Sequence, residues 1–416
     1  YFTRLRKCLL QNQDKLPRND INCRVISALS IQCYLNGYIY DSDVNEEAAI
    51  ESLDKEIEDQ IARGERPKII QVLILACYQQ IKDKPWTSSL DKKSNIDEFL
   101  KVHVVEPKTE INLSTDIPAH LISNEVSSVV SEHYEQNPYP KWTSLRLEPK
   151  PYRVEQFFSS KSLKLHRPAF FDEQRKIDIL VAGCGTGQEC IELASQIRNC
   201  RVLATDISLS SLAFAKRKSQ EYGIKNIDFL KLDILDIKTL DRRFDLVMCS
   251  GVLHHMEEPL RGWKELQSTL VDWGLMKVAL YSAKARSVFP RLYHSLTSDG
   301  SKLSNNELRK FRTRFRDTQK KNYPEVFTTF DFYNLSEFRD LLVHSTEHRF
   351  DINDIKSMLE ILGLRFCGFE NRKLLGIFLS KFNGKESLYN LEKWDQFENT
   401  YPKSFKSMYQ FWCQKQ

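Results

Sequence analysis

A short apolar run that leads straight into a glycine-rich turn constrains this chain most strongly. Residues 177–182 are almost entirely apolar, and apolar residues return at helical spacing in residues 190–197. Between the two runs stand Gly183, Cys184, Gly185, Thr186 and Gly187. Glycines at alternate positions let the backbone turn sharply and approach a ligand without side chains in the way. The feature predicts a strand, a ligand-binding turn and a helix.

Four more short apolar runs follow, and helical patterns such as residues 212–215 separate them. These runs are residues 201–205, 227–232, 244–249 and 275–281. Strands that helices cover on both faces read as unbroken apolar runs of this kind. We therefore predict a Rossmann-like α/β core, with a mostly parallel, doubly wound sheet.

The chain continues after this core with a helical pattern and two further strand candidates. The helical pattern ends at Gly363, and the strand candidates are residues 364–369 and 374–382. Only four residues separate these two runs, a length that suits an antiparallel hairpin better than another crossover. We predict a seven-stranded sheet that ends in this hairpin.

The length of 416 residues predicts more than one domain. Residues 1–82 are predicted to be helical, because positions such as Ile26, Leu29 and Cys33 recur at three- and four-residue spacing. The remaining divisions follow from composition and pattern. They are a linker or irregular arm (83–118), the first part of the core (119–283), a helical insertion (284–345), the completion of the core (346–384) and an aromatic cap (385–416).

Composition narrows the class of protein further. Lys and Arg number 61 against 56 Asp and Glu, a mildly basic balance that by itself does not argue for nucleic acid. The longest apolar stretch, residues 69–77, is shorter than the roughly 20 residues of a membrane span, and no leader pattern follows Tyr1. The ten cysteines form no C-x-x-C pair. We expect a cytoplasmic protein with reduced, buried thiols and no metal site.

Polar residues end the predicted strands at one edge of the sheet. Asp206 follows the second strand about 20 residues after the glycine turn, where an acid can bind both hydroxyls of a ribose. Asp233 follows the third strand, where a carboxylate can reach the exocyclic amine of an adenine, and Ser250 follows the fourth. Open α/β sheets bind ligands at this carboxyl edge. The alternative is that the glycine turn serves only close packing.

In this combination, residues 177–281 resemble the cofactor-binding core of class I S-adenosylmethionine-dependent methyltransferases. The resemblance implies that the glycine turn holds the methionine part, Asp206 the ribose and Asp233 the adenine, with S-adenosylhomocysteine as product. It also implies an appended antiparallel seventh strand. The candidate cofactor-binding residues are Gly183, Cys184, Gly185, Gly187, Asp206, Ile207, Asp233, Ile234, Ser250, Tyr134 and Trp142.

A second resemblance covers shorter segments. Residues 134–142 (YEQNPYPKW), 338–342 (FRDLL) and 347–349 (EHR) resemble a bacterial methyltransferase subgroup that is often fused to helical repeats. Lys141 stands where that subgroup usually has arginine. Within this neighbourhood the chain is similar to rickettsial protein lysine methyltransferases that modify an outer membrane protein. The resemblance implies a protein substrate, an outer membrane protein that is methylated before its export. Nucleic acid is not expected as a partner.

Methyl transfer to an amine depends mainly on proximity and alignment, and an attacking lysine must first lose its proton. The candidate catalytic residues are Tyr139, His254, His255 and Tyr281. The segment around Tyr139 is predicted to close over the methyl donor, unless Pro138 and Pro140 only shape a rigid connector. The histidines can equally be helix-entry residues bonded to the backbone, and Tyr281 can equally belong to the core. Zinc is not expected, because neither histidine has a partner four residues away.

Two further features keep alternatives open. The basic stretch 284–321 is either a solvated helix face or a module for an acidic protein, an RNA or a second copy of the chain in a homodimer. Glu347 and His348 are either an acid–base pair or a helix cap. Besides protein lysine methylation, the sequence leaves open RNA or small-molecule methylation by the same fold, and a non-catalytic binding module.

Overall fold

The computed structural model describes residues 1–90, 96–136, 138–166, 168–171, 175–289, 303–324, 326–342 and 347–416. They fall into two compact units. The helical unit comprises residues 1–112, 140–142 and the described part of 293–343. The sheet unit comprises the described parts of 113–139, 143–292 and 344–416.

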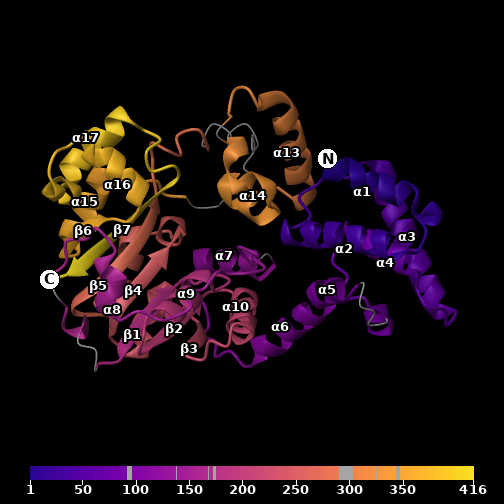
Figure 1. Cartoon of the computed structure of the whole chain (residues 1–416), viewed down its shortest axis with the longest axis horizontal. Coiled ribbons are helices and arrows are strands. Elements are labelled where there is room, and N and C mark those ends of the chain that lie inside the picture. The colour runs from indigo at the N-terminus through magenta and orange to yellow at the C-terminus, as the bar shows by residue number, and fades with distance from the viewer. Residues whose placement is uncertain are drawn as a thin grey trace. The chain divides into compact units, whose positions relative to one another are not determined.

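The sheet unit is built on a seven-stranded sheet in the order β3-β2-β1-β4-β5-β7-β6 (Figure 1). Neighbouring strands from β3 to β5 run parallel, and β7 runs antiparallel between β5 and β6. The strands are β1 (Ile177–Ala182), β2 (Cys200–Asp206), β3 (Ile227–Lys231), β4 (Phe244–Ser250), β5 (Leu270–Tyr281), β6 (Leu364–Phe369) and β7 (Met408–Lys415). The direction of winding reverses beside β1, so the turn after this strand lies at a topological switch point.

The predicted fold class is confirmed, and so are the first five predicted strands. Strand β5 starts earlier than expected, at Leu270, because the pairing register shifts between Phe244 and Leu246 and accommodates the extra residues. Trp273, within β5, has a left-handed backbone (φ 62°). A bulge of this kind hides the start of a strand from a simple apolar pattern.

The prediction of a strand at 374–382 is wrong, since Arg372–Leu379 form helix α16. Asn371 caps this helix through the N–H of Leu374, and Leu374, Leu375 and Phe378 bury one helical face. The antiparallel partner of β6 is instead β7, from the segment expected to be only a cap. The terminal antiparallel pair therefore exists, but almost forty residues separate its two strands along the chain.

Helices cover both faces of the sheet. In β1, Ile179 and Val181 alternate with Leu180 and Ala182, and all four are buried. The helices of this unit are α7 (Glu125–Gln136), α8 (Val154–Ser159), α9 (Gln188–Gln196), α10 (Leu209–Glu221), α11 (Pro259–Ser268), α15 (Ile352–Ile361), α16 and α17 (Leu391–Thr400). Its 3₁₀ helices are η4 (Ala169–Phe171), η5 (Ile234–Leu240), η6 (Leu253–His255) and η9 (Lys385–Tyr389).

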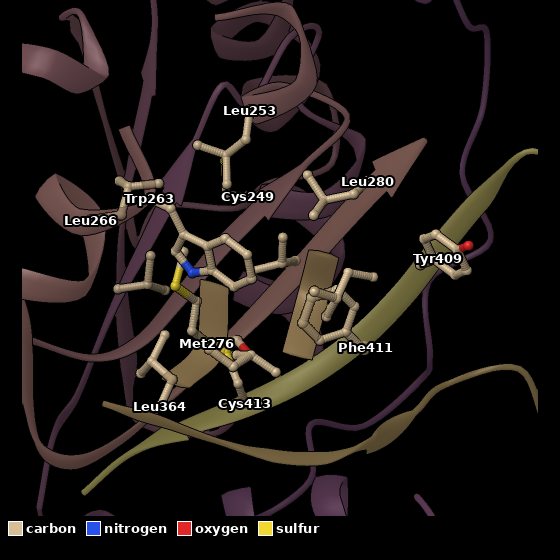
Figure 2. Close-up of a cluster of buried hydrophobic side chains, with 14 of the residues drawn as sticks. Cys249, Leu253, Trp263, Leu266, Met276, Leu280, Leu364, Tyr409, Phe411 and Cys413 are labelled. Carbon is tan, nitrogen blue, oxygen red and sulfur yellow. The ribbon is translucent and has the colours of Figure 1, made fainter. Parts of the chain in front are cut away.

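A large buried cluster joins strands of the sheet to helices α11 and α15 to α17. Figure 2 shows part of this cluster. Trp263 of α11 packs among Met276 of β5 and Phe411 of β7 in this cluster. The aromatic tail contributes to it as expected, because Trp394 stacks on Phe378 at 3.7 Å between ring centroids and Phe405 is buried. Aromatic burial thus fixes the last strand against the core.

The helical unit contains two groups of helices that are far apart in the sequence. The first group is α1 (Phe2–Gln11), η1 (Gln13–Lys15), α2 (Asp20–Leu35), α3 (Val44–Ala62), α4 (Ile69–Leu75), η2 (Pro85–Ser89), α5 (Asp97–Leu100), the π-helix η3 (Lys101–Val105) and α6 (Glu106–Thr115), whose last turn belongs to the sheet unit. The second is α13 (Asn305–Gln319), η7 (Val326–Thr328), η8 (Phe330–Tyr333) and α14 (Leu335–Leu342). The N–H of Leu335 donates to the carbonyl of Asn36 over 3.0 Å, which joins the two groups. Part of the predicted insertion therefore packs with the N-terminal helices; residues 290–302 and 343–346 lie outside the described residues.

Two sequence predictions about this unit differ in outcome. The helical pattern of residues 1–82 is confirmed. The segment 83–118, however, is not irregular, because α5, η3 and α6 occupy much of it and Phe99, Val102 and Val104 are buried. Helices of four and five residues, such as α5 and η3, contain too few turns for an apolar period to be recognised.

The sequence analysis also made predictions about the cysteines, membrane spans and metal sites. All ten cysteines are free, and nine are buried, but Cys8 is exposed, so the expectation of uniformly buried thiols fails there. None of the helices in the described residues combines the length and the apolar character that crossing a bilayer requires. The described residues also contain no group of three or more His, Cys, Asp or Glu placed to hold a metal ion.

Candidate functional site

The glycine turn joins the ends of two neighbouring strands. The N–H groups of Gly183 and Cys184 both donate to the carbonyl of Thr205 in β2, over 2.8 and 2.9 Å. The N–H of Gly187 donates to the carbonyl of Cys184 over 3.0 Å and closes the turn. Gly187 has a φ of 90° and caps α9, a left-handed conformation that favours glycine. The turn is thus fixed at the carboxyl edge of β1 and β2.

Asp206 at the end of β2 lies against this turn. Its Oδ2 accepts from the N–H of Gly185 over 2.8 Å, and its Oδ1 accepts from the N–H of Ser208 over 3.0 Å. Burial raises the pKa of Asp206 to about 6, although these backbone donors favour the ionised carboxylate. In the described part of the chain the carboxylate forms no ion pair. A buried acid of this kind suits a ligand that brings hydroxyl donors.

Asp233 occupies the corresponding position after β3. The N–H of Leu232 donates to the carbonyl of Asp206 over 3.0 Å, so the two acids follow adjacent strand ends. Asp233 is 4% exposed, and its Oδ1 accepts from the N–H of Leu235 as the cap of η5. Of the residues that follow the acids, Ile234 is buried and Ile207 is half-buried. The structure therefore brings together the acids that the sequence singled out.

The segment before the core lies over the glycine turn. Gly185 has a φ of 51°, and a Cβ at this position would lie 2.8 Å from the carbonyl oxygen of Tyr139. Only glycine accommodates this approach, because a real Cβ atom essentially never comes within 3.0 Å of another heavy atom. The backbone of Tyr139 thus covers the turn, and its side chain is half-buried.

Glu135 anchors the same segment, and the sequence analysis missed this residue. Its carboxylate accepts from the N–H groups of Leu209 and Ser210 at the start of α10, over 2.7 and 2.9 Å, and pairs with Lys231 over 3.2 Å. Burial opposes ionisation of Glu135, but these donors outweigh it and lower its pKa. Helix α7 is therefore held beside the loop after β2. Tyr134, the preceding residue, is half-buried.

The ends of β4 and β5 bring the other candidate residues together. The rings of His254 and Tyr281 stack with centroids 3.7 Å apart and planes 24° apart, and His255 meets Tyr281 edge-on at 5.5 Å. His254 is fully buried, His255 is 8% exposed and Tyr281 is half-buried. Three of the four predicted catalytic residues thus form one aromatic cluster.

An ion pair covers the other face of Tyr281. The guanidinium carbon of Arg286 lies 3.7 Å from the ring centroid, and Arg286 donates to both carboxylate oxygens of Glu347, over 3.3 and 2.8 Å. Glu347 does not cap the following helix, because Asp351 does. His348 donates its N–H to the carbonyl of His254 over 2.8 Å. The observed contacts of Glu347 and His348 are thus neither those of an acid–base pair nor those of a helix cap. Their contacts with Arg286 and His254 hold the aromatic cluster in place.

Ser250 contacts a group of charged residues. Its hydroxyl lies 3.4 Å from Oε1 of Glu189, which also accepts from Lys277 over 2.9 Å. Lys277 pairs in turn with Glu370 over 3.1 Å. Although burial opposes its charge, the two carboxylates raise the pKa of Lys277. Lys277 stands inside an apolar strand pattern, so spacing alone could not reveal this network.

Two predicted cofactor residues have less direct placements. The hydrogen bond with Cys190 and burial raise the pKa of the Cys184 thiol well above its usual range, which argues for a packing role. Trp142 is buried and belongs to the helical unit. Its predicted contact with a cofactor stays a prediction. Asn137, within the same motif, lies outside the described residues.

Residues 179–274 match a family model described as a methyltransferase domain. The matched segment runs from β1 into β5 and therefore contains the glycine turn, both acids and the two histidines.

The relatives include proteins of known and unknown activity. An uncharacterized protein of Synechococcus is 26% identical over 304 residues, which cover 66% of this chain and 68% of that protein. The probable (S)-tetrahydroprotoberberine N-methyltransferase 2 of Papaver bracteatum is 23% identical over 265 residues, or 62% of this chain and 68% of that protein. Among solved structures, PKMT2 from Rickettsia typhi aligns with a TM-score of 0.47 at 14% identity, over 63% of this chain and 52% of that chain.

The chemistry of the described residues fits the cofactor of this family. The turn offers glycines where close approach is required, and Asp206 and Asp233 are buried carboxylates at adjacent strand ends. Such acids suit the hydroxyl and amine donors of an adenosyl group. The sheet unit thus contains a class I methyltransferase domain, whose cofactor is S-adenosylmethionine.

Proposed function

We propose that this protein is an N-methyltransferase that methylates lysine side chains of a protein substrate. The observation that carries this proposal is the hydrogen bond between Gly185 and Asp206. In the proposal, these two residues cradle the adenosyl group at the switch point of the sheet. We assign the turn residues Gly183, Cys184, Gly185 and Gly187, the acids with Ile207 and Ile234, and Ser250, Tyr134 and Trp142 to cofactor binding.

Two observations support nitrogen in a protein as the acceptor. Relatives that match the core include plant N-methyltransferases. The chain also carries a second compact unit of helices, which offers surface for binding a macromolecular substrate. Residues 134–142, 338–342 and 347–349 resemble a bacterial methyltransferase subgroup. Within this neighbourhood, the similarity of the chain to rickettsial protein lysine methyltransferases suggests an outer membrane protein as substrate.

Bound S-adenosylmethionine supplies an electrophilic methyl group. The chain itself has to orient the acceptor and receive the proton of a lysine, whose ordinary pKa is about 10.4. We assign these tasks to the half-buried Tyr281 and to His255, because both border the carboxyl edge at the ends of β4 and β5. His254 is fully buried and acts as a positioning residue that stacks on Tyr281.

Tyr139, from the segment before the core, completes the proposed site. Its backbone already covers Gly185, and Glu135 holds the helix that precedes it. A segment closed over the donor would exclude water and keep the acceptor lysine neutral.

Transfer of radiolabelled methyl groups tests the proposal. The purified protein is incubated with labelled S-adenosylmethionine and, separately, with denatured outer membrane proteins, total RNA and a panel of small amines. Label recovered as methyl-lysine by mass spectrometry is the expected result, and the Asp206→Ala variant should abolish it. Label found in RNA alone contradicts the proposal. If calorimetry detects no binding of S-adenosylmethionine, the chain is a non-catalytic binding module instead.

A small amine is the second candidate acceptor. The observation that favours it is the similarity to the Papaver enzyme, which covers 265 residues, or 62% of this chain. Label in the small-amine reaction with none in protein would select this alternative.

A further inference from the structure

The helical unit contains a cavity that is separate from the residues of the methyl-transfer site. Its volume is about 330 Å³, and its walls come from the N-terminal helices and from α13. The charged residues that line it include Glu47 and Glu51 of α3 and Arg309 and Lys310 of α13. Since a water molecule occupies roughly 30 Å³ in the liquid, a cavity of this volume corresponds to about ten water molecules.

The basic side of the cavity has unsatisfied positive charge. Arg309 donates to the carbonyl of Tyr38 over 2.6 Å and to Oδ1 of Asn306 over 2.7 Å, and both acceptors are neutral. Among the described residues, neither Arg309 nor Lys310 forms an ion pair. Burial together with the nearby Arg6 and Arg339 lowers the pKa of Arg309 to about 10. Asp41 also lines the cavity, but among the described residues it forms no ion pair with either base, so both bases are available to a bound carboxylate.

Two glutamates of α3 line the same cavity. Glu47 and Glu51 are exposed and stand four residues apart on α3, so they occupy one face of that helix. In the described part of the chain they form no ion pair, either with the bases across the cavity or with other residues. One cavity therefore presents two separated charges of opposite sign.

The buried wall contains polar atoms without partners. Tyr38 is 6% exposed, and its hydroxyl has no hydrogen-bond partner among the described residues. Arg6 is 1% exposed; it donates to the carbonyl of Asp41 over 2.7 Å, but its Nε has no such partner there. Buried polar atoms are normally hydrogen-bonded, so unpaired ones beside a cavity point to a group that completes them.

We propose that this cavity binds a segment of the protein substrate that carries one acidic and one basic side chain. The carboxylate lies against Arg309 and Lys310, and the basic group lies between Glu47 and Glu51. A nucleic acid fits less well, because its phosphates would meet the acids of the same cavity. This inference rests on the proposed function in one respect, namely that the bound segment belongs to the protein that is methylated.

Fluorescence anisotropy with labelled peptides tests the binding directly, without cofactor. The probes are three dodecapeptides in alanine backgrounds, one with glutamate alone, one with lysine alone and one with both, together with a single-stranded RNA. We expect the mixed peptide to bind at least about tenfold more tightly than either single-sign peptide, a difference of about 1.4 kcal/mol. Equal binding of the acidic and mixed peptides, or preferential binding of RNA, would overturn the proposal.

Matched variants locate the site. Arg309→Gln and Glu51→Gln should each weaken binding of the mixed peptide about tenfold or more, and Lys310→Gln provides an exposed variant that leaves the packed contacts of Arg309 intact. Arg314→Gln removes the same charge from the same helix, but Arg314 is exposed and does not line the cavity, so it should have no effect. An equal loss in Arg314→Gln would mean that general helix charge, and not the cavity, binds the peptide.

The two proposals fail in different ways. The Asp206→Ala variant should lose cofactor binding and keep peptide binding, because Asp206 belongs to the sheet unit. If no protein is methylated but the mixed peptide binds, the acceptor assignment fails and the cavity stands. If proteins are methylated equally well by wild type and Lys310→Gln, and the peptide does not bind, the cavity proposal fails alone.

Discussion

The backbone N–H of Gly185 donates to Oδ2 of Asp206 over 2.8 Å, so the turn after β1 and the end of β2 meet in one hydrogen bond. The carbonyl of Tyr139 closes over the same glycine from the other side. A residue with almost no side chain thus lies between the acid and the covering segment. An alanine side chain in place of this glycine should therefore disturb the turn.

The Gly185→Ala variant should lose cofactor binding. A left-handed backbone costs an alanine roughly 1–2 kcal/mol, and the added Cβ would also push against the Tyr139 carbonyl. Gly223 is the matched control, because it has a φ of 68° but no heavy atom within 4 Å of the position that a Cβ would take. Calorimetric titration with S-adenosylmethionine should therefore show normal affinity for Gly223→Ala. If both variants lost affinity for S-adenosylmethionine equally, backbone strain alone would explain the effect.

Cofactor affinity should fall in mild acid. Since burial raises the pKa of Asp206 to about 6, its carboxylate is almost fully ionised at pH 7.5 and only about half ionised at pH 6. The ionised fractions predict about fourfold weaker binding at pH 5.5 than at pH 7.5. Titrations at both pH values measure the ratio. The Asp206→Asn variant should bind weakly at both, and a ratio unchanged from wild type would exclude Asp206 as the titrating group.

The Glu347→Gln variant should slow methyl transfer and destabilise the sheet unit. Arg286 is 1% exposed, and loss of its ionised partner leaves a buried charge, at a cost of roughly 3 kcal/mol. Because Arg286 stacks on Tyr281, kcat should fall while the affinity for S-adenosylmethionine stays the same. Thermal unfolding and initial rates measure the two effects.

The control for Glu347→Gln is Glu392→Gln. Glu392 makes the same type of pair with Lys356, but both side chains are exposed. This control should leave the melting temperature and the rate unchanged. A normal kcat in Glu347→Gln would show that the ion pair between Arg286 and Glu347 has no role in methyl transfer.

Phe411→Ala should destabilise the protein by about 3–5 kcal/mol, because it opens a cavity in the cluster of Figure 2. Phe411 lies in β7, paired with both β5 and β6. Urea unfolding of the sheet unit measures the change. Phe330→Ala provides the same substitution at a position that is 89% exposed, and it should have little effect. A small effect of Phe411→Ala would show that β7 contributes little to the core.

The site could be predicted from the sequence where its residues follow strands directly. Gly183 to Gly187, Asp206 and Asp233 each stand at the carboxyl end of a parallel strand, and such strands place their ends at one edge of a sheet. Local spacing was therefore enough to bring them together. Glu135 and the Arg286–Glu347 pair could not be found this way, because their partners lie 74 and 61 residues away along the chain.

The last strand shows the same limit for the fold. Residues 374–379 are apolar or glycine and can satisfy either a strand or a helix over so short a length, and the cap at Asn371 and burial against Trp394 select the helix. Strand β7 is chosen by its pairing with β5, which lies more than a hundred residues earlier. The sequence by itself determined the parallel core and the cofactor edge, since both depend on local pattern. Only the tertiary structure decided the edge strands, the ion pairs around Tyr281 and the joining of α14 to the N-terminal helices, because long-range burial and pairing select among local alternatives that the sequence leaves nearly equal.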